Sequence, residues 1–251
     1  MRPWTEEYYD ILEDYAWAPD RLGHKSDPDH KLENPTNVVN RLRRLEEPMN
    51  HILGIFFALA PSDIVHEVFR RHAGLASEGS LKLLGHTVAA KLQIGDLTQP
   101  DFAFDGTNSF LTIEAKVGTN KSSLEQLLKY AALHAAAKKA TPGRIHGLLY
   151  LSSSSQVGLF SEPFVDWSDL KRLANERLPH VKKGTLKGMS YEQQASVLQA
   201  LSELHIGHVT YSELADLIEH RTRDVTAAAD EVAGRLYKGV VAEIDRRQLR
   251  P

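Results

Sequence analysis

Alternating apolar and polar side chains mark two short segments near the middle of the chain. Residues 101–104 read Asp-Phe-Ala-Phe, and residues 111–117 read Leu-Thr-Ile-Glu-Ala-Lys-Val. Successive side chains of an extended strand point to opposite faces, so Thr112, Glu114 and Lys116 share one face and the intervening apolar residues share the other. The pattern predicts two amphipathic strands.

A turn is expected between these two strands. Residues 105–109 read Asp-Gly-Thr-Asn-Ser, a composition typical of the connection in an antiparallel hairpin. A turn centred in this segment places Asp101 opposite Glu114 and Phe102 opposite Ile113. One face of the hairpin then joins the core, and the other holds two carboxylates and an ammonium group.

Apolar residues recur at helical spacing on both sides of the hairpin. After it, the capping-box signature Ser122-x-x-Glu125 predicts the start of a helix. The remaining elements expected in the first part of the chain are helices over residues 35–45, 48–60 and 62–72 and strands over residues 88–94 and 145–151.

The pattern becomes helical beyond the serine run of residues 152–155. We expect Gly207 to end one helix of this region and Thr210-x-x-Glu213 to begin the next. The helices over residues 191–204, 211–220 and 225–237 fit either a helix-turn-helix or a plain helical bundle. The sequence therefore predicts two regions: residues 1–155, a core with N-terminal helices, and residues 156–251, a mostly helical region.

The predicted hairpin suggests a metal site. Two carboxylates that face each other across strands repel unless a cation lies between them. Magnesium prefers oxygen ligands and keeps several of its waters, so one or two carboxylates plus a substrate phosphate suit it. We expect Asp101 and Glu114 to bind Mg²⁺ or Mn²⁺, with the backbone carbonyl of Ala115 as a further ligand.

Two more side chains are candidates for catalysis. Lys116 beside such a metal would hold or help deprotonate an attacking water and offset charge on a phosphate in the transition state. Gln126 lies one helical turn before Tyr130 in the following helix. It would direct a water or a phosphate oxygen toward the metal.

These motifs resemble those of the PD-(D/E)XK nuclease superfamily, the fold shared by many restriction endonucleases. Asp101, Glu114 and Lys116 match its defining triad, and Gln126 with Tyr130 matches a Q-x-x-x-Y pattern of some members. The resemblance covers roughly residues 32–153. It implies an α/β fold with a restriction-endonuclease-like three-layer core, a mixed sheet flanked by helices, with a helical N-terminal cap and a helical C-terminal region. It also implies a metal-dependent nuclease that cuts DNA in restriction, defence or repair.

The resembled family also carries an acidic residue on a helix before the sheet. Glu33 precedes the helix opening Asn34-Pro35-Thr36 and resembles the E-x-x-T openings of relatives. Glu46 and Glu47 precede a second apolar helix and are alternatives. A carboxylate in a first helical turn also interacts favourably with the helix dipole, which explains each of these positions without a metal.

Composition restricts the class of protein. The chain has 251 residues, 42% of them hydrophobic and 25% charged, which is enough for one large or two modest domains. It has no cysteine, so disulfides and thiolate metal sites are excluded and a reducing cytoplasm is expected. No apolar stretch approaches the ~20 residues of a membrane span.

The charge of the chain bears on its partners. A formal net charge of −3 is not that of a typical nucleic-acid binder. A local concentration of basic residues is expected either to contact phosphate or to form a solvated surface; its members are Lys171, Arg172, Arg177, Lys182, Lys183 and Lys187. DNA is the expected partner, ahead of RNA, and cutting of duplex sites would favour a homodimer. The alternatives are an RNA-cleaving enzyme and a non-catalytic nucleic-acid-binding or scaffold protein with the same fold.

Overall fold

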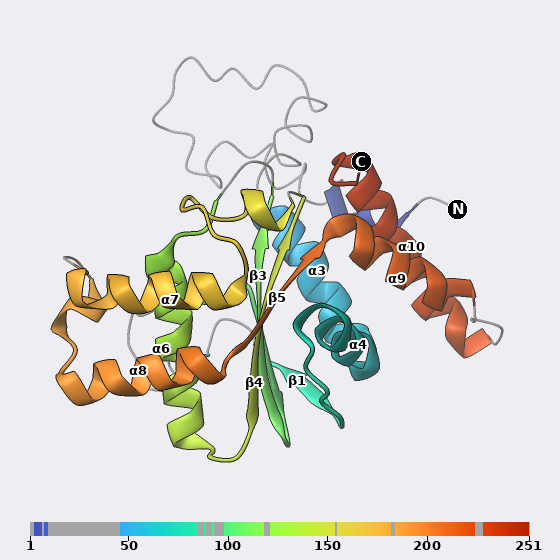
Figure 1. The fold of residues 1–251 in the computed structure, drawn as a ribbon. Coiled ribbons are helices and arrows are strands. Elements are labelled where there is room, and N and C mark those ends of the chain that lie inside the picture. The colour runs from blue at the N-terminus through green and yellow to red at the C-terminus, as the bar shows by residue number, and fades with distance from the viewer. Residues whose placement is uncertain are drawn as a thin grey trace, which may run out of the picture. The chain divides into compact units, whose positions relative to one another are not determined.

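A five-stranded mixed sheet forms the centre of residues 60–210, with the strand order β1-β2-β3-β4-β5 (Figure 1). Neighbouring strands are antiparallel from β1 to β3 and parallel from β3 to β5. The strands are β1 (Leu81–Leu83), β2 (Phe102–Gly106), β3 (Ser109–Lys116), β4 (Ile145–Ser152) and β5 (His205–Thr210).

The structure is a computed structural model, and it describes most of the chain. The described residues are 3–6, 8–9, 46–84, 88, 92, 98–117, 121–153, 155–181, 184–223 and 228–250. The chain divides into two compact units, one of residues 60–210 and one of residues 1–59 with 211–251.

The hairpin register predicted from the sequence is confirmed. Phe102 pairs with Ile113 and Ala103 with Thr112 in the antiparallel ladder of β2 and β3. Because side chains alternate along a strand, this register puts Thr112, Glu114 and Lys116 on one face of the sheet.

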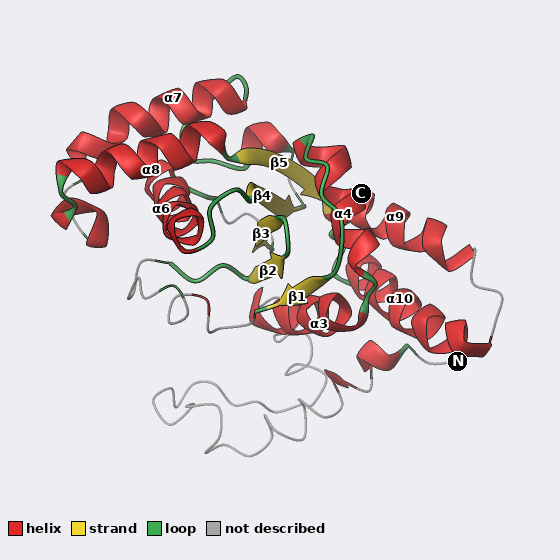
Figure 2. Ribbon diagram, turned by 90° about the horizontal axis from the view of Figure 1, so that it is seen from below, coloured by secondary structure: helices red, strands yellow, loops and turns green. Residues whose placement is uncertain are grey.

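Helices cover both faces of this sheet (Figures 1 and 2). One face carries α6 (Leu124–Ala140), α7 (Trp167–Arg177) and α8 (Tyr191–Glu203), and α4 (Ser62–Ala73) packs on β4 and β5 from the other. The predicted α/β class, a mixed sheet flanked by helices, is therefore confirmed. The unit also contains the short 3₁₀ helices η3 (Gln156–Gly158), η4 (Leu178–His180) and η5 (Thr185–Gly188).

The sequence alone suggests a solvent-exposed polar face for the hairpin, but in the structure this face is buried. Thr112 is fully buried and the side chain of Glu114 is only 5% exposed, because α6 lies over them. A strand buried on both faces is what a parallel connection through a helix produces, since the crossover helix has to lie on the sheet. The carboxylate of Glu114 is consequently held inside a helix–sheet interface.

The start of α6 differs by one residue from the predicted cap. Ser123, and not Ser122, is the N-cap, and its hydroxyl accepts a hydrogen bond from the backbone N–H of Gln126 at 3.2 Å. The backbone of Ser122 is instead bonded to the segment after η3: its N–H donates to Leu159 at 2.8 Å and its carbonyl accepts from Ser161 at 3.0 Å. These long-range bonds are not visible in a local capping pattern.

Two glycines allow α4 and the segment that follows it to approach the sheet closely. A Cβ at Gly147 would lie 2.8 Å from the Phe69 ring, and a Cβ at Gly207 would overlap the backbone carbonyl of His72. The helix ends at Gly74, which adopts the left-handed conformation with φ 60°. Glycine at both strand positions therefore sets the distance between the layers.

The second compact unit is helical. It contains α3 (Glu46–Leu59), α9 (Tyr211–Arg223) and α10 (Ala228–Arg246), and α10 packs on both of the others. The N-terminal segment also bonds to α10: the Tyr9 hydroxyl donates to the buried carboxylate of Glu243 at 2.7 Å, and Arg247 pairs with the same oxygen at 2.7 Å.

Several predicted elements are wrong. Val88 is helical and the Leu92 N–H donates to its carbonyl at 3.0 Å, so these two residues of the expected strand over 88–94 are not extended. Gly207 lies within β5 instead of ending a helix, and that strand separates α8 from α9, so the first two of the three expected helices are not joined by a turn. The expected boundary at residue 155 falls inside the sheet-containing unit.

None of the described helices is by itself long and apolar enough to cross a membrane. The helices Pro48–Leu59 and Ser62–Ala73 reach the required length and apolar composition only when they are counted together as one bent pair.

Candidate active site

Glu114 is the centre of a polar cluster near the carboxyl end of β3. Its Oε1 accepts a hydrogen bond from the Gln126 side chain at 2.5 Å and pairs with the Lys116 ammonium at 2.5 Å. Its Oε2 accepts a hydrogen bond from the Tyr130 hydroxyl. Three donors from β3 and α6 therefore converge on one carboxylate, which is how a buried charge is normally stabilised.

Asp101 joins this cluster from the other strand of the hairpin. It lies at a bend just before β2, and its Oδ2 accepts a hydrogen bond from the backbone N–H of Ala115 at 2.8 Å. This bond fixes the Asp101 carboxylate next to the residue that follows Glu114, as the hairpin register requires.

The α6 helix supplies its polar side chains at four-residue spacing. Gln126 and Tyr130 contact Glu114, and one turn further His134 contacts Thr112 at 2.9 Å. Residues four apart lie on one face of a helix, so a single stripe of α6 follows β3 from its carboxyl end toward its amino end. The predicted placement of Gln126 and Tyr130 on one face is confirmed.

Burial and charge act together on Tyr130. Desolvation is the largest cause that raises the pKa of its hydroxyl well above the usual value, and the neighbouring charge of Glu114 and then that of Asp101 raise it further. The hydroxyl consequently stays protonated and donates to Glu114. Both carboxylates act on this one phenol, which is consistent with their lying on the same side of the hairpin.

Three further residues near this site are not evident from the sequence motifs. Tyr150 is in register with Glu114 on the neighbouring strand, is fully buried, and has no hydrogen-bond partner for its hydroxyl among the described residues. Ser152, in register with Lys116, bonds to His208 with 2.9 Å between Oγ and Nε2. The sequence does not predict a strand over residues 205–210, and the register of the parallel strands is what brings His208 to this face.

Asp101 and Glu114 are the described side chains of this cluster that could hold a magnesium or manganese ion. Among the described residues no three or more His, Cys, Asp or Glu side chains are grouped to hold a metal. Magnesium does not need such a group, because one or two carboxylates suffice when water and substrate phosphate complete its octahedron. Asp101 and Glu114 supply these hard oxygen donors, and Lys116 provides the positive charge beside Glu114 in the structure.

The remaining predicted site residues are Glu33, its alternatives Glu46 and Glu47, and Ala115. Glu33 lies outside the described residues. Glu46 and Glu47 begin α3, which belongs to the other compact unit. Ala115, whose carbonyl is the predicted further ligand, lies beside Asp101, and its backbone N–H donates a hydrogen bond to the Asp101 carboxylate.

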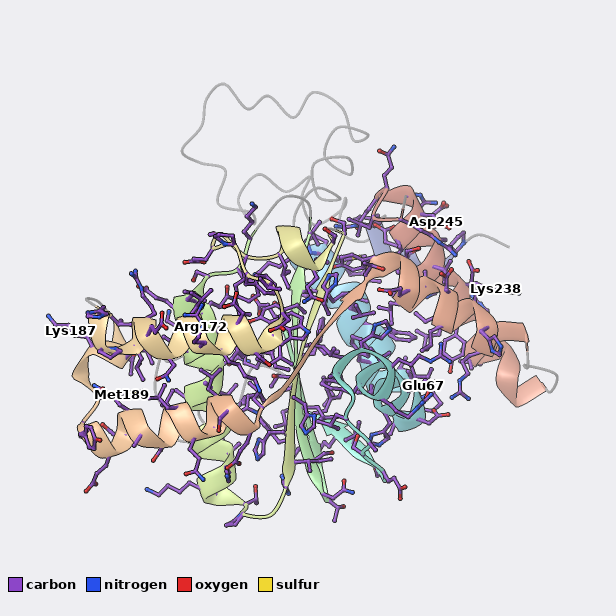
Figure 3. The ribbon with its side chains drawn as sticks, in the orientation of Figure 1. Glu67, Arg172, Lys187, Met189, Lys238 and Asp245 are labelled. Atoms are coloured by element: carbon purple, nitrogen blue, oxygen red, sulfur yellow. The ribbon has the colours of Figure 1, made fainter. Side chains whose placement is uncertain are left out.

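Three of the four described members of the predicted basic concentration are engaged in ion pairs or hydrogen bonds. Arg172 on α7 pairs with Asp169 and Glu176, Arg177 pairs with Glu125, and Lys171 donates to the Ser202 carbonyl at 3.0 Å. Figure 3 labels Arg172, which lies on α7, and Lys187, which lies in η5. Lys182 and Lys183 lie outside the described residues.

Comparison with protein-family models, with curated proteins and with solved structures found no match to this chain.

Proposed function

We propose that this chain is a metal-dependent nuclease that hydrolyses DNA phosphodiester bonds and has a restriction-endonuclease-like core. The observation that carries the proposal is the convergence of Lys116, Gln126 and Tyr130 on the Glu114 carboxylate, with Asp101 held beside them by the Ala115 amide. The triad and the Q-x-x-x-Y pair of the sequence thus form one cluster, near the carboxyl ends of the parallel strands where α/β sheets bind ligands. A cytoplasmic location and action as a homodimer are part of the same proposal.

Asp101 and Glu114 are the residues that would hold Mg²⁺ or Mn²⁺. The ion, when bound, supplies a water of lowered pKa and a charge that stabilises the attacked phosphate. Gln126 and Tyr130 hold the Glu114 carboxylate in a fixed orientation from α6, so little has to rearrange when substrate binds.

Lys116 has the role of a mobile cation in this proposal. In the structure its ammonium neutralises Glu114, and its side chain is 12% exposed. A divalent ion on Glu114 would replace that charge and release the ammonium toward solvent. There Lys116 orients the attacking water and stabilises the negative charge that develops on the phosphate oxygens.

A direct test compares cleavage by the wild type and by Lys116→Ala on linear, circular, single-stranded and RNA substrates, with magnesium, manganese or chelator. We expect metal-dependent cutting of DNA by the wild type and a loss of about 10²–10³-fold in the variant. Lys139→Ala is the matched control, because Lys139 is exposed at the far end of α6 from Gln126. Equal cutting by Lys116→Ala and the control would disprove the assignment.

A non-catalytic nucleic-acid-binding protein is the second candidate. It is favoured by the saturation of Glu114, whose two oxygens already accept from three donors and are balanced by one cation. Calorimetric titration with Mn²⁺ separates the two candidates. A signal that disappears in Asp101→Ala supports the nuclease, whereas no binding at millimolar metal together with no turnover supports the second candidate.

A further inference from the structure

A small cavity lies at the opposite end of the same sheet from the Glu114 cluster. Its volume is ≈ 170 Å³, and its lining includes His134, Lys138, Arg144, His146, Glu203 and His205. His146 and His205 lie at the amino ends of β4 and β5, whereas the Glu114 cluster lies near the carboxyl end of β3.

A chain of buried hydrogen bonds ends in this cavity. Thr112 Oγ1 lies 2.9 Å from His134 Nε2, and His134 Nδ1 lies 3.0 Å from His146 Nδ1. His146 is 8% exposed, and its remaining ring nitrogen, Nε2, is buried without a hydrogen-bond partner among the described residues. An unsatisfied buried nitrogen costs free energy and therefore indicates a missing partner.

The donor and acceptor order of these hydrogen bonds decides whether the missing partner of His146 is an acceptor or a donor. If the Thr112 hydroxyl donates to His134, then His134 Nδ1–H donates to His146, and His146 Nε2–H is left as a donor. In the reverse direction the Thr112 hydroxyl has to donate to the Gly147 carbonyl, which is 3.4 Å away. That distance is beyond the usual range, so the first direction uses the better bonds and leaves a donor for an acceptor ligand.

Two cationic side chains line the cavity, and each is paired with a carboxylate in the structure. Lys138 pairs with Glu203, and Arg144 pairs with Asp105 at 2.5 Å. The pKa of His146 is lowered to about 4, mainly by burial and then by the charges of Lys138 and Arg144, while the charge of Glu203 opposes them. The ring of His146 therefore stays neutral at physiological pH.

We propose that this cavity binds a small oxyanion through the His146 Nε2–H and the cationic side chains of Lys138 and Arg144. The side chain of Glu203 is 49% exposed and can turn toward solvent when the anion takes its place on Lys138. Binding would complete the hydrogen-bond chain through His134 to Thr112, which lies on β3 two residues before Glu114. The ligand is of the class of phosphate, sulfate or a short carboxylate.

Inorganic phosphate is the probe for the test, with the imidazole nitrogens of the whole protein observed by long-range ¹H–¹⁵N correlation. We expect a saturable shift of the His146 Nε2 resonance with phosphate. Lys138→Met and Arg144→Met should each weaken the apparent affinity about tenfold, because each loses one charge-assisted contact. Lys139→Met is the matched control, since Lys139 is the exposed neighbour of Lys138. Parallel titrations with sulfate and acetate then distinguish a tetrahedral from a planar anion.

Three outcomes would overturn the proposal. A His146 resonance that does not move at millimolar phosphate would mean that the cavity holds water only. An equal response of Lys138→Met, Arg144→Met and the control would place the anion elsewhere on the surface. The Lys116→Ala substitution should leave phosphate binding in this cavity unaffected. A response that this substitution abolishes would assign the phosphate to the Glu114 cluster instead.

Discussion

The carboxylate of Glu114 shows how this protein keeps a charge inside a helix–sheet interface. Its side chain is 5% exposed, and an unpaired carboxylate in that position would be strongly destabilising. One ammonium, one amide and one phenol donate to it. At the scale of single residues, the stability of the fold and the chemistry of the site therefore depend on the same few hydrogen bonds.

The two buried tyrosines beside Glu114 provide a matched pair of variants. Tyr130→Phe removes the hydrogen bond to the carboxylate and should lower the free energy of unfolding by about 1–3 kcal/mol. Tyr150→Phe removes a hydroxyl that has no partner among the described residues, so it should be neutral or slightly stabilising. Urea denaturation of both variants at neutral pH measures the difference.

The opposite order of the two tyrosine variants would mean that Tyr150, and not Tyr130, satisfies Glu114. Equal losses in both would indicate that the two phenols act only through packing. The ring of Tyr150 makes an edge contact with Phe160 at 5.1 Å between centroids, and this contact is kept in the phenylalanine variant.

At the scale of elements, α6 determines where the polar chemistry lies. The helix buries apolar residues on most of its sides, so its polar residues do not form the usual exposed face. Four polar residues follow one another on it at four-residue spacing. Gln126 and Tyr130 bond to Glu114. His134 bonds to Thr112, and Lys138 bonds to Glu203. One helix thus lines the candidate catalytic cluster and the oxyanion cavity at its two ends.

The close packing of α4 on the sheet predicts a strong effect of one methyl group. Gly207→Ala would force a Cβ against the backbone carbonyl of His72, which cannot move without shifting the end of α4. We expect the free energy of unfolding to fall by about 3 kcal/mol or more. Thermal or urea unfolding monitored by circular dichroism provides the measurement.

Gly188→Ala is the control for this substitution. Gly188 is exposed in η5 and a Cβ there would meet no other part of the protein within 4 Å besides its own chain neighbours and helix backbone, so the effect should stay within about 0.5 kcal/mol. A Gly207→Ala protein as stable as this control would show that α4 is not held against β5 in solution.

At the scale of the whole molecule, the buried histidine pair should make stability depend on pH. Burial lowers the pKa of His134 well below its usual value and that of His146 to about 4. A group whose folded pKa is lowered stabilises the fold fully above its unfolded pKa of about 6.5, and that contribution is lost as the pH falls through the folded pKa. Stability should therefore decrease between pH 6.5 and about 4.

The share of His146 in this decrease is on the order of 2–3 kcal/mol, since each unit of pKa shift corresponds to ~1.4 kcal/mol. His146→Asn should show a shallower fall of unfolding free energy over this pH range, because an amide does not titrate. His180→Asn, at an exposed histidine of η4, should follow the wild type. Identical pH profiles for wild type and His146→Asn would mean that folding does not shift the pKa of His146.

The sequence by itself determined the local features of this protein. The alternation of residues 101–117 and the turn composition between them were sufficient for the hairpin and its register, because a shift by one residue would move every apolar side chain out of the core. The spacing of Gln126 and Tyr130 was sufficient to put both on one helical face. These are properties of strand and helix periods, which are written in neighbouring residues.

Only the tertiary structure decided which separate elements meet. Contacts between residues far apart in the chain place three features of this protein. They are the helix that covers Glu114, the strand β5 with His208, and the contact of His134 with His146. β5 was missed because the glycine and two histidines of His205–Thr210 weaken its strand pattern, while its partner β4 and the close approach of α4 stabilise it as a strand. Long-range packing overrides local preference at such positions, and it is there that the polar side chains of this protein are brought together.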